Sequence, residues 1–410
     1  MQTRDGSRYG LGVRGRILLG LAVLVAAALG LNYLRPVPVV TAKASVQTQR
    51  TIAGAPPLLP WPRAGSAAVG VSGLGKLADS GNESQLPTAS VAKVMTAVVI
   101  LHDKPLQVGQ TGSSITITDV DVQAYQSDRA QQQSVVAVQT GEVLTEYQAL
   151  QAMLIPSGNN IAETLARWDA GSVPAFVDLM NQRARSMGLT RSTFADPAGA
   201  SAQTVSTPSD LLALGMTAME DKVFAQIVST PQATLPVAGV VYNVDSALGQ
   251  DGIAGIKTGS GLAQGANFLF AASVTIGGHP VTIFGCVMGL PTLQAAFTEA
   301  RTLIKAMQPA LTVKQELARN QAVGGYDTAW GTHSDVLSTA DVFLVEWPGM
   351  VLREQLAAPV LSIDKPVDPG TGSGSLHVVL GDYDLDVPLV TATALYPPGR
   401  IWRLTRLPTS

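Results

Sequence analysis

The sequence predicts an α/β domain, in which an antiparallel sheet carries a block of helices, followed by a small all-β domain and preceded by one transmembrane helix. Three patterns predict it. An uncharged run covers residues 17–34, helical and strand-like patterns fill residues 64–308, and mostly short β-rich segments follow. Hydrophobic residues make up 46% of the 410-residue chain and charged residues 14%, a composition typical of a folded globular protein.

The N-terminus predicts export. The run at 17–34 is long enough to cross a bilayer as a helix. Four upstream arginines (Arg4, Arg8, Arg14 and Arg16) predict that residues 1–16 stay in the cytoplasm. A cleaved signal peptide is the alternative, because residues 26–28 are alanines that a signal peptidase could accept. The length of the run favours an uncleaved single-pass anchor in a bacterial membrane. With cleavage the protein is secreted, and in either case everything after Arg35 is exported.

The predicted elements follow in order. Residues 35–63 are rich in proline and have no hydrophobic period, which predicts a linker. Residues 64–308 are predicted to form the main domain, which opens with a hairpin around Gly73 and Gly75. Strands are expected at 67–71, 253–259, 267–276 and 281–289. Helices are expected at 90–102, 145–155, 160–168, 173–187, 208–218 and 291–307.

Residues 309–410 are predicted to form the small β domain. Strand-like patterns occur at 342–347, 376–380 and 385–389, and a glycine-rich loop lies at 368–374. No helix is expected beyond about Arg319. The last residues are too short and too rich in proline to anchor the chain in a membrane by themselves.

The most informative motif is Ser90-Val91-Ala92-Lys93 at the start of a predicted helix. Residues three apart share one helix face, so the Lys93 amine can reach the Ser90 hydroxyl. A serine becomes a useful nucleophile at neutral pH only beside a base. This spacing alone is weak evidence, because Ser362 and Lys365 have the same spacing by chance.

The order of three motifs gives the evidence its weight. After Ser90 and Lys93, the chain places Ser157 and Asn159 at a predicted turn between helices, and then Lys257-Thr258-Gly259 on a predicted strand. Ser80-Gly81-Asn82 also fits the second motif but precedes the nucleophile. Together, the ordered set predicts serine acyl transfer.

The ordered set resembles the signature of the penicillin-recognising serine enzymes. Within them the chain is similar to the low-molecular-weight penicillin-binding proteins that act as D-alanyl-D-alanine carboxypeptidases. The resemblance covers about residues 65–308 and extends to flanking stretches, which are 87–97, 141–145, 153–162, 187–189, 193–194 and 255–259. It implies the penicillin-binding/β-lactamase-like transpeptidase fold, and the C-terminal segment more loosely resembles the β domain of such enzymes.

The chemistry of the residues suggests their roles, and the resemblance implies the same ones. Ser90 attacks the carbonyl between two D-alanines and forms an acyl-enzyme. Lys93 is the base if burial and the second cation, Lys257, lower its pKa. Ser157 relays a proton to the leaving amine. Asn159 donates to the substrate amide and holds Lys93.

The strand of the third motif is the expected substrate-binding edge. Its backbone can pair with an extended peptide, while Lys257 and Thr258 bind the terminal carboxylate and Gly259 continues the edge. The resemblance implies an oxyanion hole formed by the backbone N–H groups of Ser90 and Ser260. The implied partners are a peptidoglycan stem peptide as substrate, β-lactams as covalent inhibitors and the membrane, and the oligomeric state stays open.

Several other functions are disfavoured. The net charge of −3 and the lack of a basic cluster beyond the N-terminus give no sign of nucleic-acid binding. No zinc-binding spacing is present, so no metal or cofactor is expected. Cys286 lies in an apolar run and is expected to be a buried strand residue. Among the four histidines, His102 lies too far along the Ser90 helix to act as its base, and His279 is expected in an exposed turn.

Two alternatives share the motif order. A class A β-lactamase needs a glutamate that activates the deacylating water, and no Glu lies between Glu163 and Glu220. A non-catalytic β-lactam sensor or wall-binding scaffold would be expected to have lost Ser90, Lys93 or Lys257, and all three are present. One departure remains. Relatives often carry an arginine where this chain has residues 279–281, so recognition of the substrate carboxylate is expected to be weaker or to rely on Lys257 and Thr258.

Overall fold

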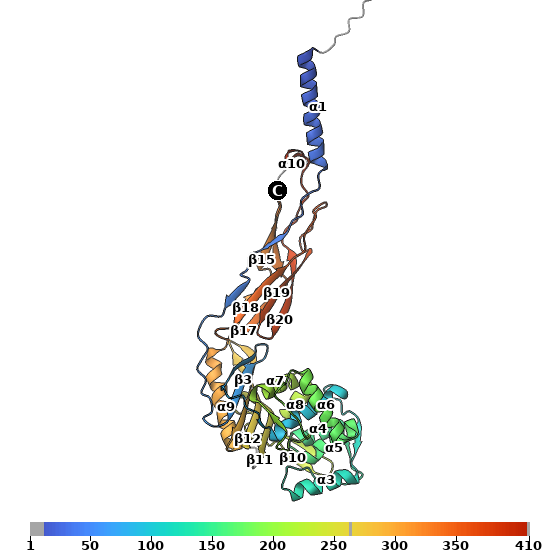
Figure 1. Cartoon of the computed structure of the whole chain (residues 1–410), viewed down its shortest axis with the longest axis vertical. Helices are drawn as coiled ribbons and strands as arrows, with labels where there is room; N and C mark the ends of the chain where they lie inside the picture. The colour runs from blue at the N-terminus through green and yellow to red at the C-terminus, as the bar shows by residue number, and fades with distance from the viewer. Residues whose placement is uncertain (1–11, 262–264, 408–410) are drawn as a thin grey trace, which may run out of the picture.

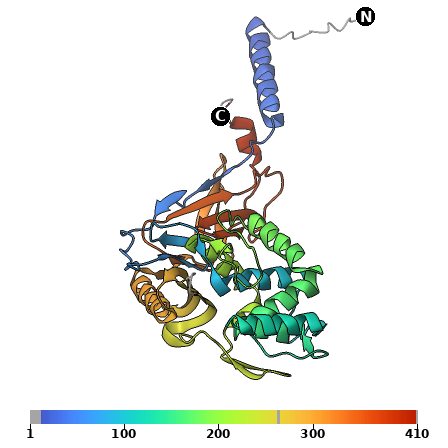
Figure 2. The ribbon, with the colours of Figure 1, turned by 60° about the horizontal axis from the view of Figure 1, so that its bottom comes forward.

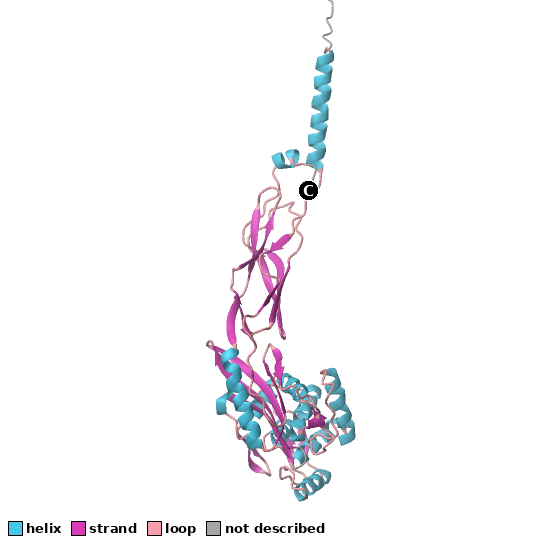
Figure 3. Ribbon diagram, turned by 60° about the vertical axis from the view of Figure 1, so that its left-hand side comes forward, coloured by secondary structure: helices cyan, strands magenta, loops and turns pink. Residues whose placement is uncertain are grey.

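The computed structural model describes residues 12–261 and 265–407 and has an elongated shape. The apolar helix α1 (Val13–Leu34) forms one end, a β-rich body lies in the middle, and an α/β body forms the other end (Figure 1). Figure 3 shows that the helices, apart from α1 and the short α10, gather in the α/β body.

The α/β body is built on a five-stranded antiparallel sheet with the order β11-β12-β13-β3-β4. The bounds are β3 Ser66–Val71, β4 Gly75–Asp79, β11 Ile253–Gly261, β12 Gly265–Ile276 and β13 His279–Leu290. The N-terminal hairpin thus joins the three later strands, and these predicted strands are confirmed within about two residues. The whole helical block is inserted between β4 and β11.

The sheet is apolar on both faces because both are covered. Along β12, Phe268 and Phe270 point to one core, while Leu269 and Ala271 point to the other, as the alternation of a strand requires. Gly285 of β13 lies against the Phe270 ring, where an added Cβ would come within 2.2 Å of it. Strand β11 is an edge strand of this sheet. It contacts the helical turn at residues 89–92.

Helices cover the two faces of this sheet. Helix α9 (Leu293–Met307) packs on β12 and β13, and α7 (Pro208–Ala218) packs on the opposite face against β13 and β3. The remaining helices of the block are η1 Ala89–Ala92, α2 Lys93–Asp103, α3 Asp119–Ala130, α4 Glu146–Leu154, α5 Asn159–Ala170, α6 Val173–Ser186 and α8 Lys222–Val228. Short two-stranded ribbons connect them: β5 Leu86–Pro87 with β8 Val205–Ser206, β6 Ser114–Thr116 with β7 Val143–Thr145, and β9 Gln232–Leu235 with β10 Gly239–Tyr242.

Local sequence explains where several helices begin. Thr145 and Gln148 form a reciprocal capping box at the start of α4. Ser172 and Thr207 cap α6 and α7, and each of these helices has a proline in its first turn. Helix α3 (Asp119–Ala130) lies where no helix is expected from the sequence. Thr118 and Asp121 form another capping box at its start.

The β-rich body contains a seven-stranded sheet with the order β1-β15-β16-β20-β19-β18-β2 and a separate pair, β14 with β17. The bounds are β1 Ala42–Ala44, β2 Gln49–Thr51, β14 Thr312–Leu317, β15 Ala322–Asp327, β16 His333–Ser338, β17 Val342–Glu346, β18 Val351–Ala357, β19 Gly372–Leu380 and β20 Tyr383–Thr391.

The prediction that residues 35–63 are only a linker is wrong, because this segment contains strands β1 and β2. Strands β1 and β2 lie at the two edges of the seven-stranded sheet and pair with β15 and β18. Val40 and Ile52 are buried in its core. Pairing satisfies backbone groups that an edge strand would otherwise expose, and so short segments with little β pattern still form strands. The β-rich body therefore contains residues that precede the α/β body in the sequence as well as residues that follow it.

The prediction of no helix beyond about Arg319 is also wrong, because α10 covers Arg400–Thr405. The single turn η3 (Gln308–Ala310) lies before Arg319. Helix α10 lies beside the lower end of α1 (Figure 2). Helix α1 is long and apolar enough to cross a membrane, and none of its residues is buried.

Candidate active site

Ser90 lies in η1, between the β5 ribbon and α2, and is half-buried. The backbone before it is tightly held. The Asn267 side chain on β12 donates to the carbonyls of Pro87 and Thr88 at 2.9 and 3.0 Å. Ala89 adopts a left-handed φ of 48°, a conformation that a non-glycine residue keeps only when its surroundings enforce it. The hydroxyl is thus presented at a rigid turn.

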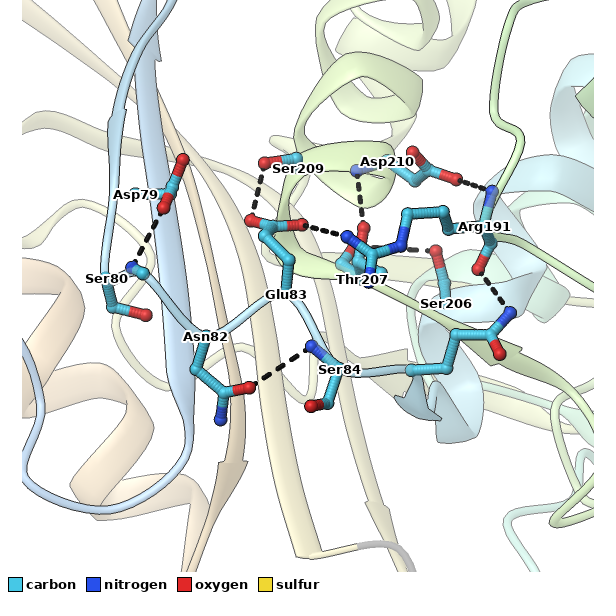
Figure 4. A network of polar contacts seen from close by, with 12 residues as sticks. Asp79, Ser80, Asn82, Glu83, Ser84, Arg191, Ser206, Thr207, Ser209 and Asp210 are labelled. Carbon is cyan, nitrogen blue, oxygen red and sulfur yellow. Dashed lines mark hydrogen bonds and ion pairs between the residues drawn. The ribbon is translucent and has the colours of Figure 1, made fainter.

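A polar network holds the segment that leads to this turn (Figure 4). Glu83 accepts a hydrogen bond from the Ser209 hydroxyl at 2.6 Å and lies 4.0 Å from the Arg191 guanidinium. Gln85 donates to the Arg191 carbonyl at 2.9 Å. Both partners belong to the helical block, so the segment from β4 to Ser90 is tied to α7 and to the loop before it.

The Lys93 side chain is fully buried, and its amine has three neighbours. Nζ lies 2.8 Å from Ser90 Oγ, 2.5 Å from Asn159 Oδ1 and 2.9 Å from the Ala198 carbonyl. Burial and then the positive charge of Lys257 lower the pKa of Lys93 well below its usual value, while the carboxylates of Asp196 and Asp128 oppose that shift. Ser90 and Lys93 are therefore brought together, and the Lys93 amine gives up its proton more readily than an exposed lysine does.

Asn159 is oriented by a residue that the sequence analysis does not identify as part of the site. Its amide nitrogen donates to Gln133 Oε1 at 2.6 Å, which fixes the amide oxygen toward Lys93. The Gln132 turn, with φ 59°, and a hydrogen bond from the Gln133 N–H to the Asp128 carbonyl set the position of Gln133. The run of three glutamines at 131–133 is the feature of the sequence that could have indicated this contact, but it matches no known motif.

Ser157 follows α4 in a left-handed conformation with φ 67°. Its Oγ is buried and has no hydrogen-bond partner within the described part of the chain. A buried hydroxyl without a partner is costly unless another molecule completes it. The Ser157 hydroxyl therefore retains its hydrogen-bonding capacity for a further partner.

Strand β11 brings the third motif against the nucleophile. Lys257 is 1% exposed and pairs in register with Leu269, whose side chain faces the helical block. At Gly259, an added Cβ would lie 2.7 Å from the Thr88 carbonyl and 3.1 Å from the Ser90 nitrogen. Only glycine permits this approach. Thr258 is buried and Ser260 is exposed at the end of the strand.

Two further carboxylates shape the electrostatics of the site. Burial lowers the pKa of Lys257 to about 7, although Asp245 opposes this shift. Burial raises the pKa of Asp245 to about 6, and one of its carboxyl oxygens lacks a partner among the described residues. The pKa of Asp128 is raised in the same way as that of Asp245. Burial and then the negative charge of Glu163 raise it to about 6. Neither carboxylate belongs to a motif, and so no pattern in the sequence marks Asp245 or Asp128 as part of the site.

Asp196 shapes the loop that supplies the third neighbour of Lys93. Its carboxylate accepts from the backbone N–H groups of Ala198, Ala200 and Ser201 and from the Thr204 hydroxyl. This network turns the Ala198 carbonyl toward the amine. Gly199 follows, where an added Cβ would lie 1.8 Å from the Ala89 carbonyl.

Other residues discussed from the sequence lie outside this cluster. His102 contacts Asp103 at the end of α2, and His279 stacks on Phe343. Asn160, next to Asn159, exchanges two hydrogen bonds with the Val136 backbone. Cys286 is buried, and burial raises the pKa of its thiol. Within the described ranges, no group of three or more His, Cys, Asp or Glu side chains could hold a metal ion.

Comparison with known sequences agrees with this arrangement. The sequence model of the family described as D-alanyl-D-alanine carboxypeptidase matches residues 63–292, which include all three motifs. The chain is 32% identical over 194 residues to the D-alanyl-D-alanine carboxypeptidase DacB2 of Mycobacterium tuberculosis. That match covers 46% of this chain, and the chain spans 62% of the length of that relative.

Two solved structures have a similar fold. The Streptomyces K15 DD-transpeptidase is 26% identical, with a TM-score of 0.54, and the match covers 61% of this chain and 98% of that one. Penicillin binding protein 5 from Haemophilus influenzae is 19% identical, with a TM-score of 0.60, and covers 84% of this chain and 100% of its own. The second likeness extends beyond the α/β body, and at this identity it concerns the fold alone.

Proposed function

The chain belongs to the D-alanyl-D-alanine carboxypeptidase family, and from this premise we propose that it removes the terminal D-alanine from peptidoglycan stem pentapeptides. The reaction proceeds through an acyl-enzyme on Ser90. The observation that carries the proposal is the set of neighbours around the Lys93 amine, which lies 2.8 Å from Ser90 Oγ and contacts two pure acceptors on its other sides.

These neighbours suit a neutral amine that acts as a base. A neutral amine has two N–H groups and one lone pair. Asn159 Oδ1 and the Ala198 carbonyl can only accept hydrogen bonds. When the two N–H groups of the neutral amine are donated to them, the lone pair is left for the Ser90 hydroxyl, which can donate as well as accept. Lys93 then removes the Ser90 proton while Oγ attacks the carbonyl carbon of the penultimate D-alanine.

The next step breaks the peptide bond. The tetrahedral intermediate collapses, the C–N bond breaks, and the leaving D-alanine nitrogen receives a proton. Ser157 can relay it from the protonated Lys93 amine, accepting one proton as it gives up its own, because its buried hydroxyl has no protein partner among the described residues and can both donate and accept. Water then hydrolyses the ester, which restores Ser90 and releases the shortened peptide.

Strand β11 is the proposed substrate edge. Its backbone from Lys257 to Ser260 would pair with the extended stem peptide, while the Lys257 ammonium and the Thr258 hydroxyl bind the terminal carboxylate. The backbone N–H groups of Ser90 and Ser260 form the proposed oxyanion hole, and Gly259 permits the two segments to approach closely.

A β-lactam is expected to acylate Ser90 and to leave slowly. Among the described residues, Lys93 Nζ bonds to Ser90 Oγ, Asn159 Oδ1 and the Ala198 carbonyl, and none of these hydrogen bonds joins a carboxylate to the nucleophile. The glutamate that activates the deacylating water in class A β-lactamases has no counterpart in the sequence between Glu163 and Glu220. The protein is therefore proposed to be an inhibited target of penicillins rather than an enzyme that destroys them.

Helix α1 is proposed to be an uncleaved single-pass anchor, with residues 35–410 outside the cytoplasm. The β-rich body lies between α1 and the α/β body (Figure 1). It is then a spacer of fixed length that holds the active site away from the membrane and toward the wall. Residues 64–308 form the proposed catalytic domain and residues 309–410 most of the spacer.

Release of D-alanine tests this proposal. The full chain in detergent is expected to release one D-alanine from a pentapeptide ending in D-Ala-D-Ala, and none from the same peptide ending in L-alanine. A matched substrate whose terminal carboxylate is amidated separates the neighbouring activities: cleavage of the amidated peptide in preference to the free acid would point to an endopeptidase. Penicillin binding without release from any peptide would point to a sensor.

Removing the Gln133 side chain is expected to slow acylation without abolishing it. Gln133→Ala frees the Asn159 amide to rotate, so the acceptor oxygen facing Lys93 is held only part of the time. The expected loss is about tenfold in the rate of penicillin acylation, the value of one hydrogen bond of about 1 kcal/mol or slightly more. The measurement is stopped-flow acylation, with the exposed Gln139→Ala as the matched control. Equal rates for both variants would remove Gln133 from the site.

A further inference from the structure

A short ribbon of two strands, β9 and β10, carries an exposed face that the proposed reaction does not use. Side chains alternate between the two faces of a strand. On the inner face, Ala233 and Leu235 pack into the core of the helical block. The outer face is exposed, and its members are cross-strand partners: Thr234 with Val240 and Gln232 with Tyr242. These four residues are the outer face of the ribbon.

The outer face carries apolar and neutral polar side chains but no charge. Tyr242 is 67% exposed and Val240 48% exposed, and Val244, two positions beyond Tyr242, is 40% exposed. The sequence has no charged residue from 223 to 244. Proteins usually protect a short exposed ribbon with charged side chains, because unpaired strand edges and apolar patches promote association. An exposed and uncharged face that carries an aromatic ring therefore indicates a binding surface.

The backbone of the ribbon is held at both ends. At its base, the Asn243 side chain donates to the carbonyls of Val228 and Thr230, at 3.1 and 3.0 Å. At its turn, the Val237 N–H donates to the carboxylate of the buried Glu142 at 3.2 Å. The outer face is therefore presented by a fixed backbone, and a ligand that binds there does not first have to order the ribbon.

The ribbon adjoins the second and third motifs of the active site. The Val244 N–H donates to the Ile155 carbonyl at 3.2 Å, and Ile155 stands two residues before the second motif. Asp245 follows directly, and its carboxylate opposes the lowering of the Lys257 pKa by burial. A strand advances about 3.3 Å per residue, so Tyr242 lies about 7 Å along the chain from the contact with Ile155. The outer face thus lies beside the catalytic cluster, in the half of the α/β body that is farther from α1 (Figure 1).

The substrate extends beyond the two D-alanines that react. In peptidoglycan, the N-terminal end of the stem peptide is bonded to an amino sugar of the glycan strand. Four extended residues span up to about 14 Å, which exceeds the two-residue step from Tyr242 to the contact with Ile155. The sugar is uncharged and has apolar C–H faces with hydroxyl groups at its rim, whereas the stem peptide carries ionised side chains. Of these two parts of the substrate, the sugar matches the uncharged outer face.

We propose that the outer face of the ribbon binds the amino sugar to which the stem peptide is attached. The ring of Tyr242 then lies against a C–H face of the sugar, and Gln232 and Thr234 bond to its hydroxyl groups. Tyrosine supplies a large contact area at a small cost in conformational entropy. Glutamine and threonine can both donate and accept hydrogen bonds, as sugar hydroxyls require. The inference rests on the proposed function, and it gives the enzyme a preference for stem peptides that remain joined to glycan.

Two substrates that differ only in the sugar test the proposal: a stem pentapeptide with N-acetylmuramic acid at its N-terminus, and the same pentapeptide with an acetyl group there. In the full chain, Tyr242→Ala is expected to lower kcat/KM for the sugar-bearing peptide about fivefold, the value of one aromatic contact. The loss should appear as a higher KM at unchanged kcat, because the contact is remote from the reacting atoms. Release from the acetylated peptide and acylation by penicillin should be unchanged.

Two further variants serve as controls for Tyr242→Ala. Tyr242→Phe keeps the aromatic ring and should retain most of the preference for the sugar-bearing peptide. Tyr396→Ala removes another exposed tyrosine, which is 56% exposed and lies near the C-terminal end of the chain. It should leave the kinetics with both peptides unchanged. Losses as large in Tyr242→Phe or in Tyr396→Ala as in Tyr242→Ala would contradict a contact between this ring and the sugar.

Three other outcomes would overturn the sugar site. Equal losses with both peptides would show that the ribbon binds the peptide, and wild-type kinetics of Tyr242→Ala with both would show that it binds neither part. A dimer that Tyr242→Ala dissociates, measured by analytical ultracentrifugation, would assign the face to a second copy of the chain. Binding of the sugar-bearing peptide to Ser90→Ala, with and without Tyr242→Ala, tests the face without turnover. A fivefold difference in that binding without D-alanine release by the wild type would support the sugar site and contradict the proposed function.

Discussion

Ser90→Ala is expected to reduce D-alanine release from a stem pentapeptide by at least about 10⁴-fold, because removing a catalytic serine leaves only binding and oxyanion stabilisation. The change deletes a half-buried hydroxyl that is hydrogen-bonded to Lys93 Nζ, so the fold should be kept. The measurement is the initial rate of D-alanine release by the full chain, together with the melting temperature of both proteins.

The chain supplies a matched control for this prediction. Ser362 and Lys365 repeat the spacing of Ser90 and Lys93, but Ser362 bonds to Asp364 in the β-rich body. Ser362→Ala is expected to release D-alanine at the wild-type rate. Equal losses in both variants, or activity in Ser90→Ala above one thousandth of wild type, would contradict the assignment of the nucleophile.

Replacing Lys93 is expected to give the second largest loss. Lys93→Arg places a permanent positive charge at this position and provides no base, because arginine does not deprotonate in proteins. General-base catalysis contributes about 10²–10⁴-fold, and the acylation rate should fall within that range. The measurement is stopped-flow acylation by a chromogenic cephalosporin, with Lys365→Arg as the matched control. A loss below tenfold would show that another group takes the Ser90 proton.

The pH dependence of acylation gives an independent check on Lys93. The base acts only when neutral, so the wild-type rate should rise with pH and level off above the pKa of Lys93, which burial and Lys257 hold well below its usual value. The Asp128 carboxylate raises that pKa. Asp128→Asn is therefore expected to move the rise to lower pH, and a shift to higher pH would contradict this electrostatic account.

Much of this site could be predicted from the sequence because the chemistry depends on short local spacings. Ser90 and Lys93 need one helical turn, and Gly259 needs only the absence of a side chain where β11 meets η1. The strands from β11 to β13 are long, apolar and separated by glycine turns, so their pairing follows from their order. These features lie within short stretches of sequence.

The features that were missed depend on contacts between distant segments. Gln133 orients Asn159 although the two residues are 26 positions apart in the sequence, and no periodic pattern relates them. Strands β1 and β2 are short, and only the unpaired edges of a sheet formed much later in the chain give them partners. Asn32 interrupts an apolar run, and nothing nearby in the sequence explains it. Its side chain donates hydrogen bonds to the carbonyls of Leu404 and Arg406, which come from the other end of the chain.

The central claim is that Ser90, activated by neutral Lys93, forms a covalent acyl-enzyme in a membrane-anchored carboxypeptidase. Peptide-mapping mass spectrometry of the full chain after exposure to penicillin tests it most directly. We predict one adduct per chain, located on the peptide that contains Ser90, which persists for many minutes while little further penicillin is consumed. An adduct on another serine, no adduct, or continued rapid consumption of penicillin would contradict the account.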